Sequence, residues 1–148
     1  MKGFFYFLVL ISFFSLSSLA SEKCFESKSG YILKQKEITQ KEYVCSIEFQ
    51  EKIFYVSKKC FDQKKSLPCA YGFQEPIKVM EIKGLLGEFG SPGFKICYEL
   101  KGEPQIFTFK SAISNEVEET DRCLFKNGEW LVIPLLVERY KGKLKNLD

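Results

Sequence analysis

The sequence predicts an all-β protein, either an antiparallel sandwich or a small, partly open barrel built from hairpins and stabilised by disulfides. Three observations support this fold class. Short segments alternate apolar and polar residues with the period of a strand, turn-forming residues separate them, and six cysteines follow an apolar leader. No segment sustains the period of an amphipathic helix, so strands are expected throughout.

The N-terminal leader has the features of a secretory signal peptide. Lys2 precedes an apolar stretch, Phe4–Phe14, and the small residues Ser18 and Ala20 occupy the positions that signal peptidase requires. The stretch is shorter than a membrane span. We therefore expect cleavage after Ala20, a secreted or periplasmic location, and no transmembrane segment in the mature chain.

The remaining chain has the length of one domain. We predict a signal peptide over residues 1–20, a single β-domain over 21–138 and a basic C-terminal tail over 139–148. The tail is basic because it contains Arg139, Lys141, Lys143 and Lys145.

In the first half of the domain, strands are predicted where apolar residues alternate. Tyr43–Phe49 alternates, and Ile53–Val56 follows it after a short polar turn. Tyr31–Leu33 and Ile77–Ile82 are also expected to be extended.

In the second half, Phe94–Leu100 alternates and Gln105–Phe109 returns after a turn. Asn127-Gly128 between two apolar runs predicts a hairpin with a type I′ turn. The run Trp130–Val137 is the most apolar stretch after the leader. It is expected to be a core strand, displaced to an edge or bulged by Pro134 because proline lacks the amide of a ladder.

Six cysteines allow fifteen disulfide pairings, and spacing alone does not select one. Cys24, Cys45, Cys97 and Cys123 each precede a polar turn and an apolar segment, a pattern that fits a repeated hairpin unit but also the general likeness of hairpins in β-proteins, which is the favoured interpretation. No C-x-x-C motif is present, so structural disulfides are favoured over metal or redox chemistry. The favoured pairs are Cys24–Cys45, Cys60–Cys69 and Cys97–Cys123.

The absence of histidine excludes several kinds of chemistry. Neither a Ser-His-Asp triad nor a histidine-containing zinc site is possible without it. We predict no catalytic residues, no metal and no cofactor. The net charge of +3 is too small to indicate a nucleic-acid partner.

A lysine-rich segment is the strongest candidate for binding, because a disulfide across it would present its charges with little entropy to lose. An anionic envelope surface or another secreted protein is the expected partner. The candidate residues are Lys58, Lys59, Phe61, Lys64 and Lys65.

These observations favour a secreted, non-catalytic binding module over two alternatives. One alternative is a carboxylate-based hydrolase of an envelope polymer, in which two acidic residues converge in a pocket. The other is an assembly protein that pairs through an apolar edge strand at Trp130–Val137. The candidate acids of the hydrolase are Glu99, Glu103, Glu116, Glu118, Asp121 and Glu129.

Glycines occur at every third position of residues 84–93. They indicate a connection between strands, with Phe89 at its tip, rather than a phosphate-binding loop.

Overall fold

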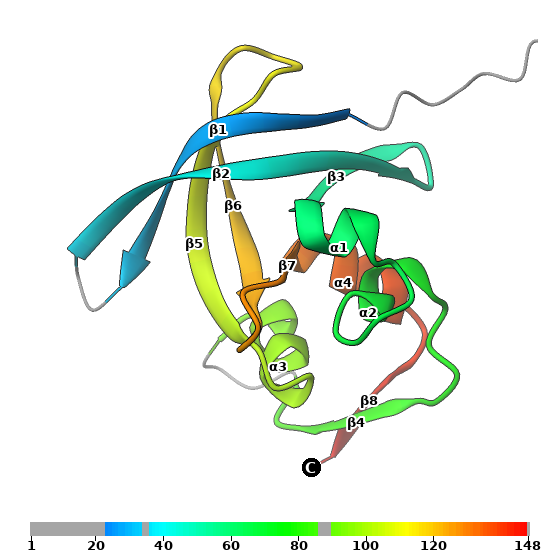
Figure 1. Ribbon diagram of the computed structural model, residues 1–148. Coiled ribbons are helices and arrows are strands. Elements are labelled where there is room, and N and C mark those ends of the chain that lie inside the picture. Colours follow the sequence, from blue (N-terminus) through cyan, green and yellow to red (C-terminus); the bar gives the residue numbers. More distant parts are fainter. Residues whose placement is uncertain (1–22, 34–35, 86–89, 148) are drawn as a thin grey trace, which may run out of the picture.

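The structure, a computed structural model, describes residues 23–33, 36–85 and 90–147. Within these residues the chain is mostly β, and six strands form a closed antiparallel barrel in the order β1-β2-β3-β7-β6-β5. The predicted disulfide-stabilised all-β class is therefore confirmed. The helices and a parallel strand pair, β4–β8, gather beside the barrel, below it in Figure 1. The predicted signal peptide and the glycine-loop tip at Phe89 lie outside the described residues.

Two antiparallel meanders make up the barrel. They join where Ser29–Tyr31 of the first meander pairs with Phe107–Phe109 of the second, and again where Val56 pairs with Leu131. The strands are β1 (Lys23–Leu33), β2 (Lys36–Phe49), β3 (Lys52–Ser57), β5 (Glu103–Lys110), β6 (Val117–Leu124) and β7 (Trp130–Val132).

Cys45 and Cys123 occupy equivalent places in the two meanders. Cys45 pairs with Val56, Cys123 pairs with Leu131, and Val56 pairs with Leu131 across the β3–β7 junction. For these two cysteines, the repeated pattern in the sequence corresponds to two similar meanders. Cys97 does not follow the pattern, because it lies in a helix.

The hairpin at Asn127-Gly128 forms as predicted, but its turn is not type I′. Gly128 has a φ of 81°, whereas Asn127 does not adopt a positive φ. The amide of Gly128 donates to the carbonyl of Phe125 at 2.9 Å, which closes a four-residue turn. One glycine in the left-handed region is enough here, since the connection is longer than the two-residue I′ loop.

The strand predicted at Phe94–Leu100 is wrong, because these residues lie in helix α3 (Pro92–Glu99) and its C-cap. Ser91 caps the helix by accepting a hydrogen bond from the Phe94 amide, and Pro92 occupies the first turn, where its missing N–H costs nothing. The buried positions have helical spacing: Gly93, Ile96, Cys97 and Leu100.

The strand predicted at Trp130–Val137 is correct only for its first three residues. β7 is buried between β3 and β6, and the chain then continues as helix α4 (Ile133–Tyr140). Pro134 lies in the first turn of α4 and starts a helix rather than bulging a strand. The run is buried as expected, but it offers no apolar edge for assembly.

The remaining elements form a small layer against the barrel. Helices α1 (Lys58–Asp62) and α2 (Ala70–Phe73) follow β3, and β4 (Met80–Lys83) pairs in parallel with β8 (Leu144–Leu147). Only the end of the extended segment predicted at Ile77–Ile82 is a strand. The predicted basic tail is folded, since it includes the end of α4 and all of β8.

The core has two parts. Between the barrel and the helices, aliphatic side chains pack closely: a Cβ at Gly72 of α2 would lie 3.0 Å from the side chain of Leu131 and from that of Leu135. Inside the barrel, aromatic rings from different strands meet, with Tyr55 4.6 Å from Phe109 between ring centroids. The helices are therefore fixed to one wall of a rigid barrel.

Three disulfides link the described cysteines, and they are the same three pairs that the sequence favoured: Cys24–Cys45, Cys60–Cys69 and Cys97–Cys123. The first joins β1 to β2, and the third joins α3 to β6. The second joins α1 to the residue before α2 and closes a loop that contains Lys64 and Lys65, whereas Lys58 and Lys59 directly precede it.

Candidate binding surface

The predicted binding residues begin at the start of α1. Ser57 caps this helix by accepting a hydrogen bond from the Cys60 amide at 3.3 Å. Lys58 and Lys59 follow at once and are exposed. Lys58 forms an i,i+4 ion pair with Asp62 at 3.0 Å, a contact that contributes little at an exposed position.

Lys59 bridges α1 to the β6–β7 turn. Its ammonium group donates to the carbonyl oxygen of Asn127 at 3.2 Å and lies 3.9 Å from the carboxylate of Glu129. Half of the Lys59 side chain stays exposed, although its ammonium group contacts the turn.

Phe61 holds the third lysine of the group. The Lys64 ammonium lies 4.8 Å from the centroid of the Phe61 ring and 5.4 Å from that of Phe73, within the range of a cation–π contact. Lys65 is exposed. The structure thus brings the five predicted residues together on α1 and the loop that follows it.

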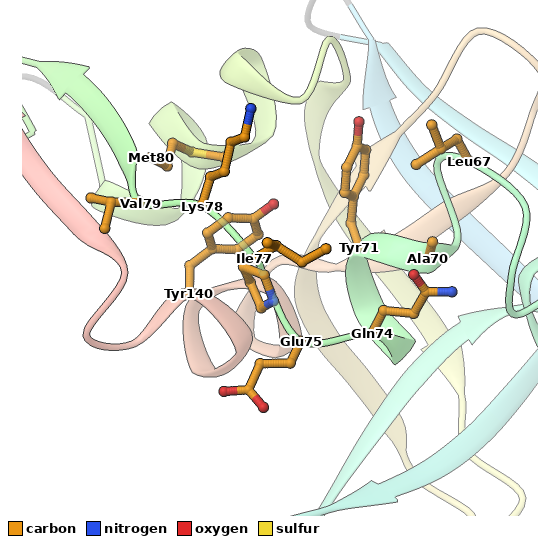
Figure 2. A pocket seen from close by; sticks show the side chains of 11 residues that line it. Leu67, Ala70, Tyr71, Gln74, Glu75, Ile77, Lys78, Val79, Met80 and Tyr140 are labelled. Atoms are coloured by element: carbon orange, nitrogen blue, oxygen red, sulfur yellow. The ribbon is translucent and has the colours of Figure 1, made fainter.

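An apolar groove lies next to this loop, and sequence reasoning did not find it. Its volume is about 330 Å³. Three aliphatic side chains on its walls face solvent: Ile77 is 95% exposed, Leu67 67% and Val79 54%. Figure 2 shows Tyr71 and Tyr140 between them. The full lining is Leu67, Ala70, Tyr71, Gln74, Glu75, Pro76, Ile77, Lys78, Val79, Met80 and Tyr140.

One ring contact and one short stretch of chain connect the groove to the lysines. Tyr71, in the groove lining, lies 6.3 Å from Phe125 between ring centroids, and Phe125 is in the same β6–β7 turn that Lys59 contacts through Asn127. In the chain, Lys65 lies two residues before Leu67 of the groove, and Lys64 three residues before it. We call this region the basic–apolar face, defined by Lys58, Lys59, Lys64, Lys65, Lys78, Leu67, Ile77 and Val79.

Charge is distributed unevenly between the two parts of the molecule. Residues 58–83 and 133–147, which form the layer beside the barrel, contain ten basic and four acidic residues. The barrel part, residues 23–57 and 103–132, contains nine basic and eleven acidic residues. The small overall charge of +3 therefore conceals a basic side that includes the basic–apolar face.

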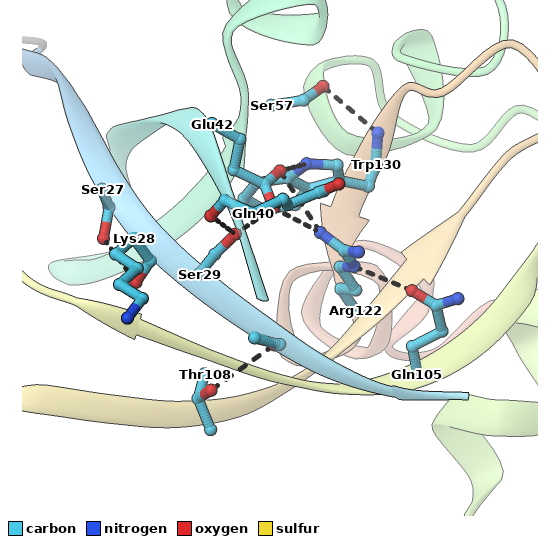
Figure 3. Close-up of polar contacts among 11 residues, drawn as sticks. Ser27, Lys28, Ser29, Gln40, Glu42, Ser57, Gln105, Thr108, Arg122 and Trp130 are labelled. Atoms are coloured by element: carbon cyan, nitrogen blue, oxygen red, sulfur yellow. Dashed lines mark hydrogen bonds and ion pairs between the residues drawn. The ribbon is translucent and has the colours of Figure 1, made fainter. Parts of the chain in front are cut away.

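A second polar cluster lies inside the barrel. Arg122 of β6 is 1% exposed and donates to Glu42 of β2 at 3.1 Å and to Gln105 of β5 at 3.1 Å. Trp130 donates its indole N–H to Glu42 at 2.8 Å, and Ser29 also donates to this carboxylate. Figure 3 shows these side chains converging from different strands. The arrangement ties the two meanders together across the barrel.

Opposing effects act on the titration of this pair. Burial alone would raise the pKa of Glu42, but the hydrogen bonds from Ser29, Gln40 and Trp130 and the charge of Arg122 outweigh burial and lower it. Burial lowers the pKa of Arg122, and the Glu42 carboxylate opposes this. The aromatic rings around the guanidinium include Phe107, whose centroid is 4.3 Å from Cζ. The network satisfies both charges internally, which indicates a structural role.

The carboxylates that a hydrolase would need are distributed over several elements, and the groove contains none of the six. Glu118 is partly buried and accepts a hydrogen bond from the Tyr55 hydroxyl at 3.1 Å. Burial, followed by the charge of Glu119, raises the pKa of Asp121. Glu99 ends α3, and Glu103 begins β5.

Glu129 is buried beside a disulfide. Its carboxylate accepts a hydrogen bond from Asn127 at 2.7 Å, and it lies near the sulfurs of Cys60 and Cys69, all within 4.8 Å of one another. Because the two sulfurs are bonded to each other, they are not thiolate ligands. This cluster is therefore part of the packing under α1.

None of the helices among the described residues has the length and apolar character needed to cross a bilayer. Comparisons of the chain with protein-family models, with curated proteins and with solved structures found no match.

Proposed function

We propose that this protein is an exported, non-catalytic binding module that holds an anionic component of the cell envelope on its basic–apolar face. The observation that supports this most directly is the position of four lysines at one disulfide of a basic side: Lys58 and Lys59 directly precede Cys60, and Lys64 and Lys65 lie inside the loop that the Cys60–Cys69 bridge closes. Export by a signal peptide that is cleaved after Ala20 would place it where such components occur.

The geometry suits recognition of negative charge at a surface. The Cys60–Cys69 bridge restricts the loop of Lys64 and Lys65, and helix α1 holds Lys58 and Lys59 beside it, so ordering these residues on binding costs little entropy. Each lysine near an anionic lipid surface contributes about 1 kcal/mol. The exposed pair of Lys58 with Asp62 does not cancel this attraction, because exposed ion pairs are worth about 0–1 kcal/mol.

Binding to vesicles of defined charge tests the proposal. The mature protein, residues 21–148, is sedimented with vesicles of phosphatidylglycerol and phosphatidylcholine, and with phosphatidylcholine alone. We expect binding only to the anionic vesicles, weakening as salt is raised. Changing the four lysines of the segment to serine should weaken binding more than about a hundredfold.

A matched variant controls for net charge. Four other exposed lysines, on β1, β2, β3 and β5, lie in the barrel part of the chain and are also changed to serine: Lys28, Lys41, Lys52 and Lys110. This variant loses the same charge but should keep most of its binding. Equal retention of the wild type and both variants on anionic vesicles would contradict the proposal.

A further inference from the structure

We propose that the groove of the basic–apolar face holds the alkyl chain of an anionic amphiphile, whose headgroup contacts the surrounding lysines. This inference rests on the proposed function and specifies its ligand. The shared chemistry is one acyl or alkyl chain joined to a phosphate or carboxylate, whether the molecule is free or part of a bilayer.

The walls of the groove are suited to a chain rather than to a polar ligand. Apolar or aromatic side chains make up most of the lining, with Ala70 and Tyr71 from α2, Met80 at the start of β4 and Tyr140 at the end of α4. Burial raises the pKa of Tyr140, which indicates surroundings that disfavour charge at its hydroxyl. A volume of about 330 Å³ accommodates part of one chain.

Ile77 and Val79 expose apolar surface that a bound alkyl chain would cover. Both lie in the connection between α2 and β4, where neither strand nor helix covers them, and Ile77 is 95% exposed. Leu67 faces the same groove from the other side of Tyr71 (Figure 2). Covering such surface is favourable in proportion to the apolar area removed from water.

The charge around the groove favours an anionic headgroup. Lys78 is itself part of the lining, and Lys65 lies two residues before Leu67. Glu75 is the one acidic side chain of the lining, and it lies close enough to Arg139 for its charge to raise the pKa of that residue, which burial lowers. In Figure 2 the Lys78 ammonium and the Glu75 carboxylate point away from each other. An anion at the Lys78 end therefore meets uncompensated positive charge.

Bonds to neighbouring elements fix the lining of the groove at α2 and at the start of β4. At one end, the Cys60–Cys69 bridge leads directly into α2, and the Arg139 guanidinium donates to the Gly72 carbonyl at 2.7 Å. At the other end, the Met80 amide donates to the Lys143 carbonyl at 2.7 Å, where β4 begins to pair with β8. A preformed groove binds a chain without first ordering its own walls.

Calorimetric titration with alkyl phosphates of six, eight, ten and twelve carbons, each below its micelle concentration, tests this inference. Each methylene that enters the groove should tighten binding about fourfold, until the chain is longer than the groove. An alkyl trimethylammonium of equal length should bind at least about tenfold more weakly, because its headgroup carries the opposite charge.

Two variants show whether the chain occupies this groove. Changing both Ile77 and Val79 to serine should flatten the dependence on chain length, and since both side chains are exposed, folding should be preserved. The control changes Ile53 and Ile113 to serine, two isoleucines outside the groove that are each 53% exposed, similar to Val79 at 54%. This control should keep the full dependence.

The outcomes separate this inference from the proposed function. Affinity that does not depend on chain length in the wild type, or a dependence that survives in the Ile77 and Val79 variant, overturns the inference. If binding to anionic vesicles still requires the four lysines of α1 and its loop, the proposed function stands without the groove. If the groove variant binds anionic vesicles more weakly than the wild type does, the groove accepts the alkyl chain of a lipid in a bilayer. Vesicle binding that is unchanged, together with a flattened alkyl phosphate series, indicates free amphiphiles.

Discussion

Replacing Glu42 by glutamine should destabilise the barrel severely, although the side chain keeps its size. The Arg122–Glu42 pair is almost inaccessible, with side chains 2% and 15% exposed. An amide at position 42 keeps one acceptor oxygen, but its NH₂ group replaces the second oxygen, which accepts from Gln40 and from Arg122, so donor groups would face donor groups. Removing one partner of a buried pair costs about 3–5 kcal/mol. For a domain of this size we expect the melting temperature to fall by about 10–20 °C.

Urea unfolding followed by far-ultraviolet circular dichroism measures this loss with the disulfides intact. The control is Glu26→Gln on the neighbouring strand β1. Glu26 forms an exposed ion pair with Lys41 at 4.0 Å, so its loss should cost less than about 1 kcal/mol. Equal losses for the two variants would refute the argument that the barrel cluster is buried and coupled.

The contribution of Glu42 to the free energy of unfolding should depend on pH. The pKa of Glu42 is lower in the folded protein than its ordinary value of 4.5. Its ionisation therefore stabilises the fold above pH 4.5, and this contribution is lost as the pH falls through the lowered pKa. The stability difference between the wild type and Glu42→Gln should shrink on acidification below that pH. A difference that stays constant down to pH 2 would contradict the assignment.

Two further predictions concern packing and cross-linking. Gly93→Ala should cost about 1–3 kcal/mol in urea unfolding, because a Cβ at Gly93 would lie 2.3 Å from a side chain of α4; an unchanged midpoint would show that α3 and α4 can separate freely. Changing both Cys97 and Cys123 to serine opens a loop with a sequence separation of 26 and should cost about 3.5 kcal/mol on the chain-entropy estimate. A loss below about 1 kcal/mol would mean that the cross-link hardly restricts the unfolded chain.

Local patterns in the sequence were sufficient for much of the β-structure. Tyr43–Phe49 and Gln105–Phe109 alternate, and both lie in barrel strands. The hairpin at Asn127-Gly128 was also accessible, because the turn signal and its flanking strands are adjacent in the chain. The lysine segment was found in the same way, since its residues are neighbours in sequence.

The helices were missed because short apolar runs fit both periods. Phe94–Leu100 alternates in polarity, but Gly93, Ile96, Cys97 and Leu100 also have helical spacing, and the start signal Ser91-Pro92 was the evidence that should have decided. At Trp130–Val137, Pro134 was interpreted as a strand breaker, although it is equally typical of a first helical turn. Packing of α3 against α4 resolves both ambiguities, and that contact joins segments far apart in the chain.

What the sequence determined by itself was the character of this protein: an all-β chain with six cysteines, no histidine and a cluster of lysines. Only the tertiary structure decided which side chains meet. Barrel closure brings Glu42 to Arg122 across 80 residues, and α4 brings Tyr140 to the groove beside Tyr71. The physical reason is that periodicity and turn chemistry act over a few residues, whereas a buried ion pair or a groove depends on how distant elements pack.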